Sequence, residues 1–486
     1  GVVEFGNPQG SVQVAANEQA TAKLGEAPRK SILLNPIDAV QWSFYYPNSV
    51  SYRDFPLSGV EPSRVSEQLA AVQAQVSASP QNVDALVALG ELRLDAGQPA
   101  EARSIFAQAL VLKSGHARAR TGLGWALLAT GEPVAAWGEF RQIQPPTLMS
   151  GVGLADALYQ LNRLDAADRI IAATTQRFPR SPLPWTQAAR NRLIQGQVVA
   201  ARQAIDRALA LAPNNALAYS LRSTIDLVQN QRAQALAAAE QAVAANPASS
   251  SAYLSLSRAQ QVAFQLDAAL AAARQAVTLD PENSQALIQE SSLLFGMGQL
   301  KAAIKVAKRA RHYAPNDAFI MTVWGFLQLA RHRIDEARTT FQQAIQQDST
   351  LGLPHLGLGL VLFRRNDTAA AVAELRKATL LEPQIALYNS YLGKAFYETK
   401  DDRRAQKYLE VAKQIDPHDP TPYLYDAIRL QNTNQPIAAV ENLQKSIELN
   451  NDRAVYRSRL LLDEDLAARS ATLGRIYNDI GFTQLG

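Results

Sequence analysis

Residues 386–419 read ALYNSYLGKAFYETKDDRRAQKYLEVAKQIDPHD, and the same pattern of residue types recurs along most of the chain every 34 residues. Its most regular member is an alanine, which returns at intervals of 34 residues with one interval of 31: Ala102, Ala136, Ala167, Ala201, Ala235, Ala269, Ala303, Ala337, Ala371, Ala405 and Ala439. In most units a second alanine follows, as Ala412 does, and then a proline, as Pro417 does. A period this constant is typical of a repeat protein, in which each unit packs on its neighbours.

Each unit predicts two short helices that face each other. In the quoted stretch, Leu392 and Phe396 share one helical stripe, and Ala405, Leu409 and Ala412 share a second. The small residues allow the two helix axes to approach closely. A residue that tolerates the left-handed conformation is expected in the turn between the helices of most units: Gly97, Gly131, Asn162, Gly196, Asn230, Gly298, Asn366 and Asn434. The proline then ends the second helix, because it lacks an N–H and clashes with the preceding turn.

This pattern resembles the tetratricopeptide repeat, which carries Trp, Leu-Gly, Tyr, Ala, Phe, Ala and Pro at set offsets. Two units carry the resemblance well: Leu89-Gly90, Ala102, Phe106 and Ala109 in one, and Trp324-Gly325, Ala337, Phe341 and Ala344 in the other. The resemblance implies a mainly α fold, a right-handed α-solenoid. It implies about eleven full repeats over residues 83–453, followed by an irregular segment and a partial repeat over residues 454–486.

The first 55 residues do not share the helical period. Val2–Phe5, Ser11–Val14 and Ser31–Leu34 are short β-favouring runs separated by Gly, Asn and Pro, which predicts a small antiparallel β segment over residues 1–55. Residues 56–82 then read as a linker and a helix that caps the first repeat, since apolar residues recur there at helical spacing.

A second resemblance concerns the stretch from Gly10 to Pro28, followed by Asn35–Trp42 and Tyr45-Tyr46-Pro47. It resembles the end of a FecR-like β domain, a domain joined to tetratricopeptide repeats in exported bacterial proteins. The resemblance implies an extracytoplasmic setting, in the bacterial envelope or secreted. The absence of cysteine is compatible with an oxidising compartment.

In the tetratricopeptide repeat family, a set of first-helix positions lines a concave groove, and this chain places many apolar residues at those positions. The resemblance therefore implies an apolar groove that binds a protein or peptide partner. The aromatic residues expected to line it are Trp125, Tyr159, Phe295, Phe326, Phe363 and Tyr397. Three isolated cations are expected in the same groove: Arg190, Arg258 and Lys394.

Composition and motifs argue against several other functions. The net charge is +4, and the basic residues look dispersed among acidic ones, so nucleic acid is not an expected partner. Without cysteine, and with five histidines in different repeats, no metal site is predicted. No phosphate-binding loop or catalytic set interrupts the repeats, so the chain is predicted to be no enzyme and to need no cofactor. No apolar run approaches the length of a membrane-spanning helix.

The two ends of the chain suggest an alternative to a binding scaffold. Leu473-Gly474 and Tyr477 restart the first-helix pattern without a second helix, and the β segment starts within a strand-like run. Unpaired surfaces of two kinds on one chain can propagate into a filament. The residues expected at such a contact are Val2, Val3, Phe5, Leu473, Tyr477 and Phe482. The competing hypothesis is that the chain is a piece of a longer protein in which both ends are completed in cis.

Overall fold

The computed structural model describes residues 3–7, 10–14, 18–21, 29–32, 57–60, 64–161, 163–195, 197–229, 231–383 and 385–449, and the structure below is that of these residues. Four strands come first: β1 Val3–Asn7, β2 Gly10–Val14, β3 Glu18–Thr21 and β4 Arg29–Ile32. β1 pairs antiparallel with β2, and β3 pairs antiparallel with β4, in two separate two-stranded sheets. The sequence pattern missed β3, because Glu-Gln-Ala-Thr shows no apolar alternation.

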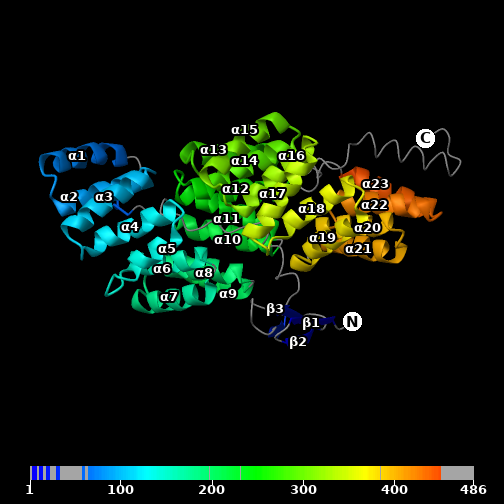
Figure 1. The fold of residues 1–486 in the computed structure, drawn as a ribbon, viewed down its shortest axis with the longest axis horizontal. Coiled ribbons are helices and arrows are strands. Elements are labelled where there is room, and N and C mark those ends of the chain that lie inside the picture. The colour runs from blue at the N-terminus through cyan, green and yellow to red at the C-terminus, as the bar shows by residue number, and fades with distance from the viewer. Residues whose placement is uncertain are drawn as a thin grey trace. The chain divides into compact units, whose positions relative to one another are not determined.

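The described residues from Val65 to Glu448 form helices joined by short turns, and all of these helices except α5 have 13 or 14 residues (Figure 1). A single helix, α1 Val65–Ala78, stands where the capping helix was predicted. Eleven pairs of a first and a second helix follow: α2 Val83–Asp95 and α3 Pro99–Leu112; α4 Ala117–Ala129 and α5 Pro133–Phe140; α6 Leu148–Gln160 and α7 Leu164–Arg177; α8 Pro182–Ile194 and α9 Val198–Leu211; α10 Ala216–Val228 and α11 Arg232–Ala245; α12 Ser250–Val262 and α13 Leu266–Leu279; α14 Ser284–Gly296 and α15 Leu300–Tyr313; α16 Ala318–Ala330 and α17 Ile334–Gln347; α18 Gly352–Arg364 and α19 Thr368–Leu381; α20 Ala386–Glu398 and α21 Asp402–Ile415; α22 Pro420–Asn432 and α23 Pro436–Glu448. The predicted mainly α solenoid is confirmed.

The chain divides into two compact units, each described by itself. The first unit, Tyr46–Leu227 with Gln231–Ala286, contains α1–α9 and α11–α13. The second unit, Gly1–Tyr45, Val228–Asn230 and Leu287–Gly486, contains the strands and α15–α23. In both units, first helices of consecutive repeats contact each other, as α6 contacts α8 and α20 contacts α22. Within each unit, we call the surface formed by these contacting first helices the first-helix face.

The turn inside each repeat needs a left-handed residue, and the structure shows which residues supply it. Of the predicted glycines and asparagines, Gly97, Gly131, Gly298, Asn366 and Asn434 all have positive φ. Three repeats use residues that the pattern did not predict: Phe264, His332 and Lys400, with φ of 61°, 58° and 63°. A backbone forced by helix packing therefore outweighs the intrinsic preference of these side chains. Asn162, Gly196 and Asn230 lie outside the described residues.

The alanines of the ladder lie where helices touch. All eleven are fully buried, at 0% exposure. In three places a phenylalanine of a second helix fits against glycines of two first helices. Phe106 lies against Gly90 of its own repeat and Gly122 of the next; Phe140 lies against Gly124 and Gly153; Phe341 lies against Gly325 and Gly357. In these repeats the glycine of the first helix thus leaves space for an aromatic ring of a second helix.

The ends proposed for self-association are only partly visible. Val3 and Phe5 lie in β1, where Phe5 is opposite Val12 in the antiparallel register. Val2, Leu473, Tyr477 and Phe482 lie outside the described residues, as does the whole predicted partial repeat.

Candidate functional site

Three of the aromatic residues predicted to line an open groove are in the core instead. Trp125, Phe295 and Phe326 are 1%, 2% and 2% exposed. Trp125 packs edge-on against Phe140, with ring centres 5.8 Å apart, and its Nε1 donates to the Met149 carbonyl of the next first helix at 3.3 Å. The groove prediction is wrong for these residues, because the neighbouring helices cover them.

The other three predicted aromatics keep part of their surface. Tyr159, Phe363 and Tyr397 are all half-buried. The Tyr397 hydroxyl accepts a hydrogen bond from Asn432 Nδ2 at 2.5 Å, which links the last two first helices. These rings are available to a partner, unlike the three in the core.

Of the three isolated cations predicted in the groove, the two arginines are buried. Arg258 is 8% exposed and Arg190 is 1% exposed. Lys394 is half-buried, with its Nζ 4.9 Å from the centre of the Tyr425 ring. Burial of both arginines means that the repeats themselves use them, so as predicted surface contacts they were wrong.

The structure brings two of the predicted residues together, Arg190 on α8 and Tyr159 on α6. The Arg190 guanidinium carbon lies 3.8 Å from the centre of the Tyr159 ring, a cation–π stack. Arg190 Nη1 donates to Asp156 Oδ1 at 2.6 Å, and both side chains are almost completely buried, at 1% and 2% exposure. Asp156 and Arg190 occupy the same place in consecutive repeats, so this ion pair joins the third repeat to the fourth.

Asp156 is fully engaged, whereas Arg190 is not. Gln160 Nε2 donates to Asp156 Oδ2 at 2.9 Å, and Gln187 Nε2 approaches Oδ1 at 3.4 Å. Arg190 Nε and Nη2 and Gln187 Oε1 have no partner among the described protein atoms. A buried network with free donors and an acceptor next to each other suits internal water, which bonds to such groups in protein interiors.

Electrostatics keeps this arginine charged. Burial alone lowers the pKa of Arg190, but Asp156 and Tyr159 more than offset it, and the pKa of Arg190 is raised. The guanidinium is therefore a permanent cation beneath the Tyr159 ring. We call Asp156, Arg190 and Tyr159 the stacked triad.

A second ion pair joins the first helices α2 and α4 in the same unit. Arg118 Nε donates to Glu91 Oε1 at 2.6 Å, and Nη2 donates to Oε2. Burial raises the pKa of Glu91, while the hydrogen bond and charge of Arg118 lower it in part. The bidentate geometry fixes the register of consecutive repeats.

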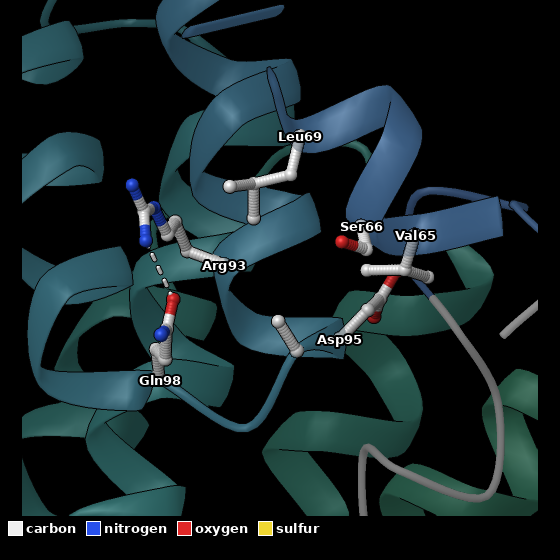
Figure 2. A pocket seen from close by; sticks show the side chains of 7 residues that line it. Val65, Ser66, Leu69, Arg93, Asp95 and Gln98 are labelled. Carbon is white, nitrogen blue, oxygen red and sulfur yellow. Dashed lines mark hydrogen bonds between the residues drawn. The ribbon is translucent and has the colours of Figure 1, made fainter. Parts of the chain in front are cut away.

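A cavity of about 360 Å³ lies where α1 covers the first repeat (Figure 2). Its polar groups are largely used internally: Arg93 Nη1 donates to Gln98 Oε1 at 2.8 Å, and Asp95 accepts from the backbone N–H groups of Leu57 and Ser58 at 2.9 and 3.0 Å. Burial raises the pKa of Asp95, and the bonds to Ser58 and Leu57 lower it in part. The cavity therefore lies between the capping helix α1 and the first repeat.

Two expected absences can be examined over the described part of the chain. There, no group of three or more His, Asp or Glu side chains could hold a metal ion. Within the same residues, none of the helices combines the length and the apolar character needed to cross a membrane.

One charged surface was missed by the sequence analysis. Helix α15 carries five Lys and Arg residues in fourteen, so the basic residues are not dispersed everywhere. The net charge of the whole chain does not reveal this helix, whereas the net charge of each helix taken separately does.

A family model described as tetratricopeptide repeat matches residues 87–147, 222–284, 322–378 and 356–420. Solved structures that resemble the chain include the crystal structure of the APC/C hetero-tetramer Cut9–Hcn1, with 13% identity, 85% of this chain and 94% of that chain covered, and a TM-score of 0.47. The human IFIT1 dimer with PPP-AAAA has 15% identity, 73% and 91% coverage, and a TM-score of 0.46. No curated protein sequence matches the chain. The family model thus finds tetratricopeptide repeats in residues 87–147, 222–284 and 322–420, all of which lie within the helix pairs.

Proposed function

We propose that the protein is a non-enzymatic scaffold that binds a segment of a protein partner on its first-helix face, with Tyr159 as an anchor. The stacked triad carries the proposal. Tyr159 is half-buried and rests at 3.8 Å on a guanidinium that is itself held by Asp156. A ring fixed in this way loses little conformational freedom on binding, and rigid tyrosines with an apolar body and a polar tip are frequent binding hot spots.

The two first helices that carry the stacked triad also present apolar side chains, which favours an apolar segment. Met149 on α6 and Leu183 and Ile194 on α8 are half-buried on the same two first helices. The charges of the stacked triad, Asp156 and Arg190, are paired with each other, so they offer a partner little direct attraction. The segment is therefore expected to bind through apolar side chains, with few charged contacts.

Tyr159→Ala is expected to weaken peptide binding at least tenfold, about what a moderate hot spot contributes. Peptides would be selected from a displayed library on the full-length chain, and their affinities measured by fluorescence anisotropy. Tyr408→Ala is the matched control, because Tyr408 is also half-buried and stacked, against Phe396 at 5.5 Å, but lies on a second helix. Equal affinities for the Tyr159 variant and the unchanged chain would refute the anchor.

We propose as a second function that the protein self-assembles outside the cytoplasm. The resemblance of residues 10–47 to a FecR-like domain supports the location. Support for assembly comes from the strands: among the described residues, β1 pairs only with β2, so one edge of β1 is open to a strand from another copy.

Removal of residues 1–15 is then expected to abolish concentration-dependent association in sedimentation velocity experiments. The deletion leaves α1 and the repeats in place, so circular dichroism should show unchanged helix content. A chain that sediments as a monomer at every concentration, with or without the deletion, would eliminate self-assembly and leave the scaffold proposal intact.

A further inference from the structure

Helix α15, Leu300–Tyr313, has two chemically opposite sides. One side is a seam of small, fully buried residues: Ala303, Ala307 and Ala310. The other side is a row of exposed basic residues, which we call the basic stripe: Lys301, Lys305, Lys308 and His312. α15 contacts α16, and the exposed basic stripe lies on the side of α15 opposite to the buried seam.

No acidic side chain accompanies the basic stripe in the sequence. Residues 291–316 contain neither Asp nor Glu. The nearest acids on either side are Glu290, which is buried, and Asp317, whose carboxylate accepts from Ile320 N at 2.8 Å as the cap of α16. Within the described residues, Lys301, Lys305 and Lys308 take part in no ion pair.

Three other second helices of the same unit each pair one lysine with a glutamate within one turn. Lys377 reaches Glu374 on α19 at 2.7 Å, Lys413 reaches Glu410 on α21 at 2.9 Å, and Lys445 reaches Glu448 on α23 at 3.0 Å. On α15 the corresponding neighbours are other cations. Like charges one turn apart cost a helix about 0.2–0.5 kcal/mol per pair, and α15 itself contains no acidic residue that offsets this repulsion.

We propose that the basic stripe docks an acidic protein segment, a surface separate from the first-helix face. At a rise of about 1.5 Å per residue the stripe is about 16 Å long. Its cations recur every three or four residues, which is the spacing of carboxylates along one face of an acidic helix. A partner of this kind removes the repulsion along α15 and gains an ion pair at each turn.

The residue types in and around the basic stripe favour a protein partner over a nucleic acid partner. Surfaces that hold single-stranded nucleic acid place aromatic rings among the cations, so that bases can stack. The stripe itself contains no aromatic side chain besides His312, and the single exposed ring at its end, Tyr313, packs edge-on against the His312 ring, with 5.1 Å between the ring centres. The Trp324 ring nearby is covered by Arg311, whose guanidinium carbon lies 4.6 Å from its centre.

The test measures binding of a labelled oligoglutamate peptide and of a labelled oligothymidylate of equal charge to the full-length chain at two salt concentrations. Lys305→Gln with Lys308→Gln is expected to weaken peptide binding about tenfold at low salt and to reduce its salt dependence. Lys377→Gln with Lys445→Gln removes the same charge from second helices whose lysines are paired, and is expected to change binding by less than about twofold.

Two outcomes would overturn the proposal. Equal losses in the two double variants would mean that the peptide senses only net charge. Tighter binding of the oligothymidylate than of the peptide, with loss on changing Lys305 and Lys308, would identify a nucleic acid surface instead. Tyr159→Ala should leave oligoglutamate binding unchanged, so failure here is distinguishable from failure of the first-helix proposal.

Discussion

Gly122→Ala is expected to destabilise the first repeats by about 2–3 kcal/mol, the upper part of the range for overpacked cores. The reason is the position of the Phe106 ring, which is fully buried between Gly90 and Gly122. A Cβ built at Gly90 would lie 2.7 Å from the Phe106 ring, and one at Gly122 would lie closer still. The ring has first-helix backbone on both sides, so it cannot move away from a new methyl group.

The matched control is Gly138→Ala on α5. A Cβ at Gly138 would meet no atom within 4 Å, so there the substitution should stabilise the helix by about 0.5–1 kcal/mol. Urea denaturation gives the overall change, and hydrogen exchange of α2–α4 locates it, since repeats open locally. If the two alanines had the same effect, the ring would not be confined as described.

A compensating change sharpens the test. Phe106→Leu alone opens a cavity, but combined with Gly122→Ala it should cost less than the sum of the two single changes. The sequence shows the same exchange of side-chain volume at equivalent positions of other repeats. The phenylalanines 106, 140 and 341 are each followed in the next repeat by a glycine, whereas Leu375 and Leu409 are followed at the same place by Tyr391 and Tyr425.

These contacts between neighbouring repeats explain how much of the fold could be predicted from the sequence. The alanine period and the apolar stripes depend on contacts between neighbours, so they predicted eleven helix pairs. The left-handed residues at Phe264, His332 and Lys400 were unpredictable from residue type, since there the packed helices impose the conformation.

The candidate site was predicted only in part. Periodicity shows which side of a helix is apolar, but not whether the next repeat covers that side, so Trp125 and Phe326 could not be told from Tyr159. The pairing of Asp156 with Arg190 joins residues one full repeat apart. A comparison of charges at equivalent places in consecutive repeats could have found it; a search within each helix could not.

Asp156→Asn is expected to destabilise α6–α8 by about 3–5 kcal/mol, the typical cost of leaving one member of a buried ion pair without its partner. Arg190 is 1% exposed and an arginine side chain stays protonated in proteins, so it can neither turn to solvent nor lose its proton. The control is Asp335→Asn. Asp335 is also paired with an arginine of the next repeat, Arg365, but their side chains are 86% and 45% exposed, and surface pairs contribute about 0–1 kcal/mol.

Replacing both charged residues separates the cost of a lone charge from the value of the pair. Asp156→Leu with Arg190→Met leaves apolar side chains in the same space, and such exchanges are often neutral or stabilising. We expect this double variant to recover most of the stability lost in Asp156→Asn, as measured by hydrogen exchange of α6–α8 and by urea denaturation. It removes the guanidinium beneath Tyr159, so selected peptides should still bind more weakly than to the unchanged chain. If the double variant recovers both full stability and full peptide affinity, the ion pair holds the repeats together but does not position Tyr159. If the double variant is as unstable as Asp156→Asn, the stability lost in Asp156→Asn does not come from the unpaired arginine.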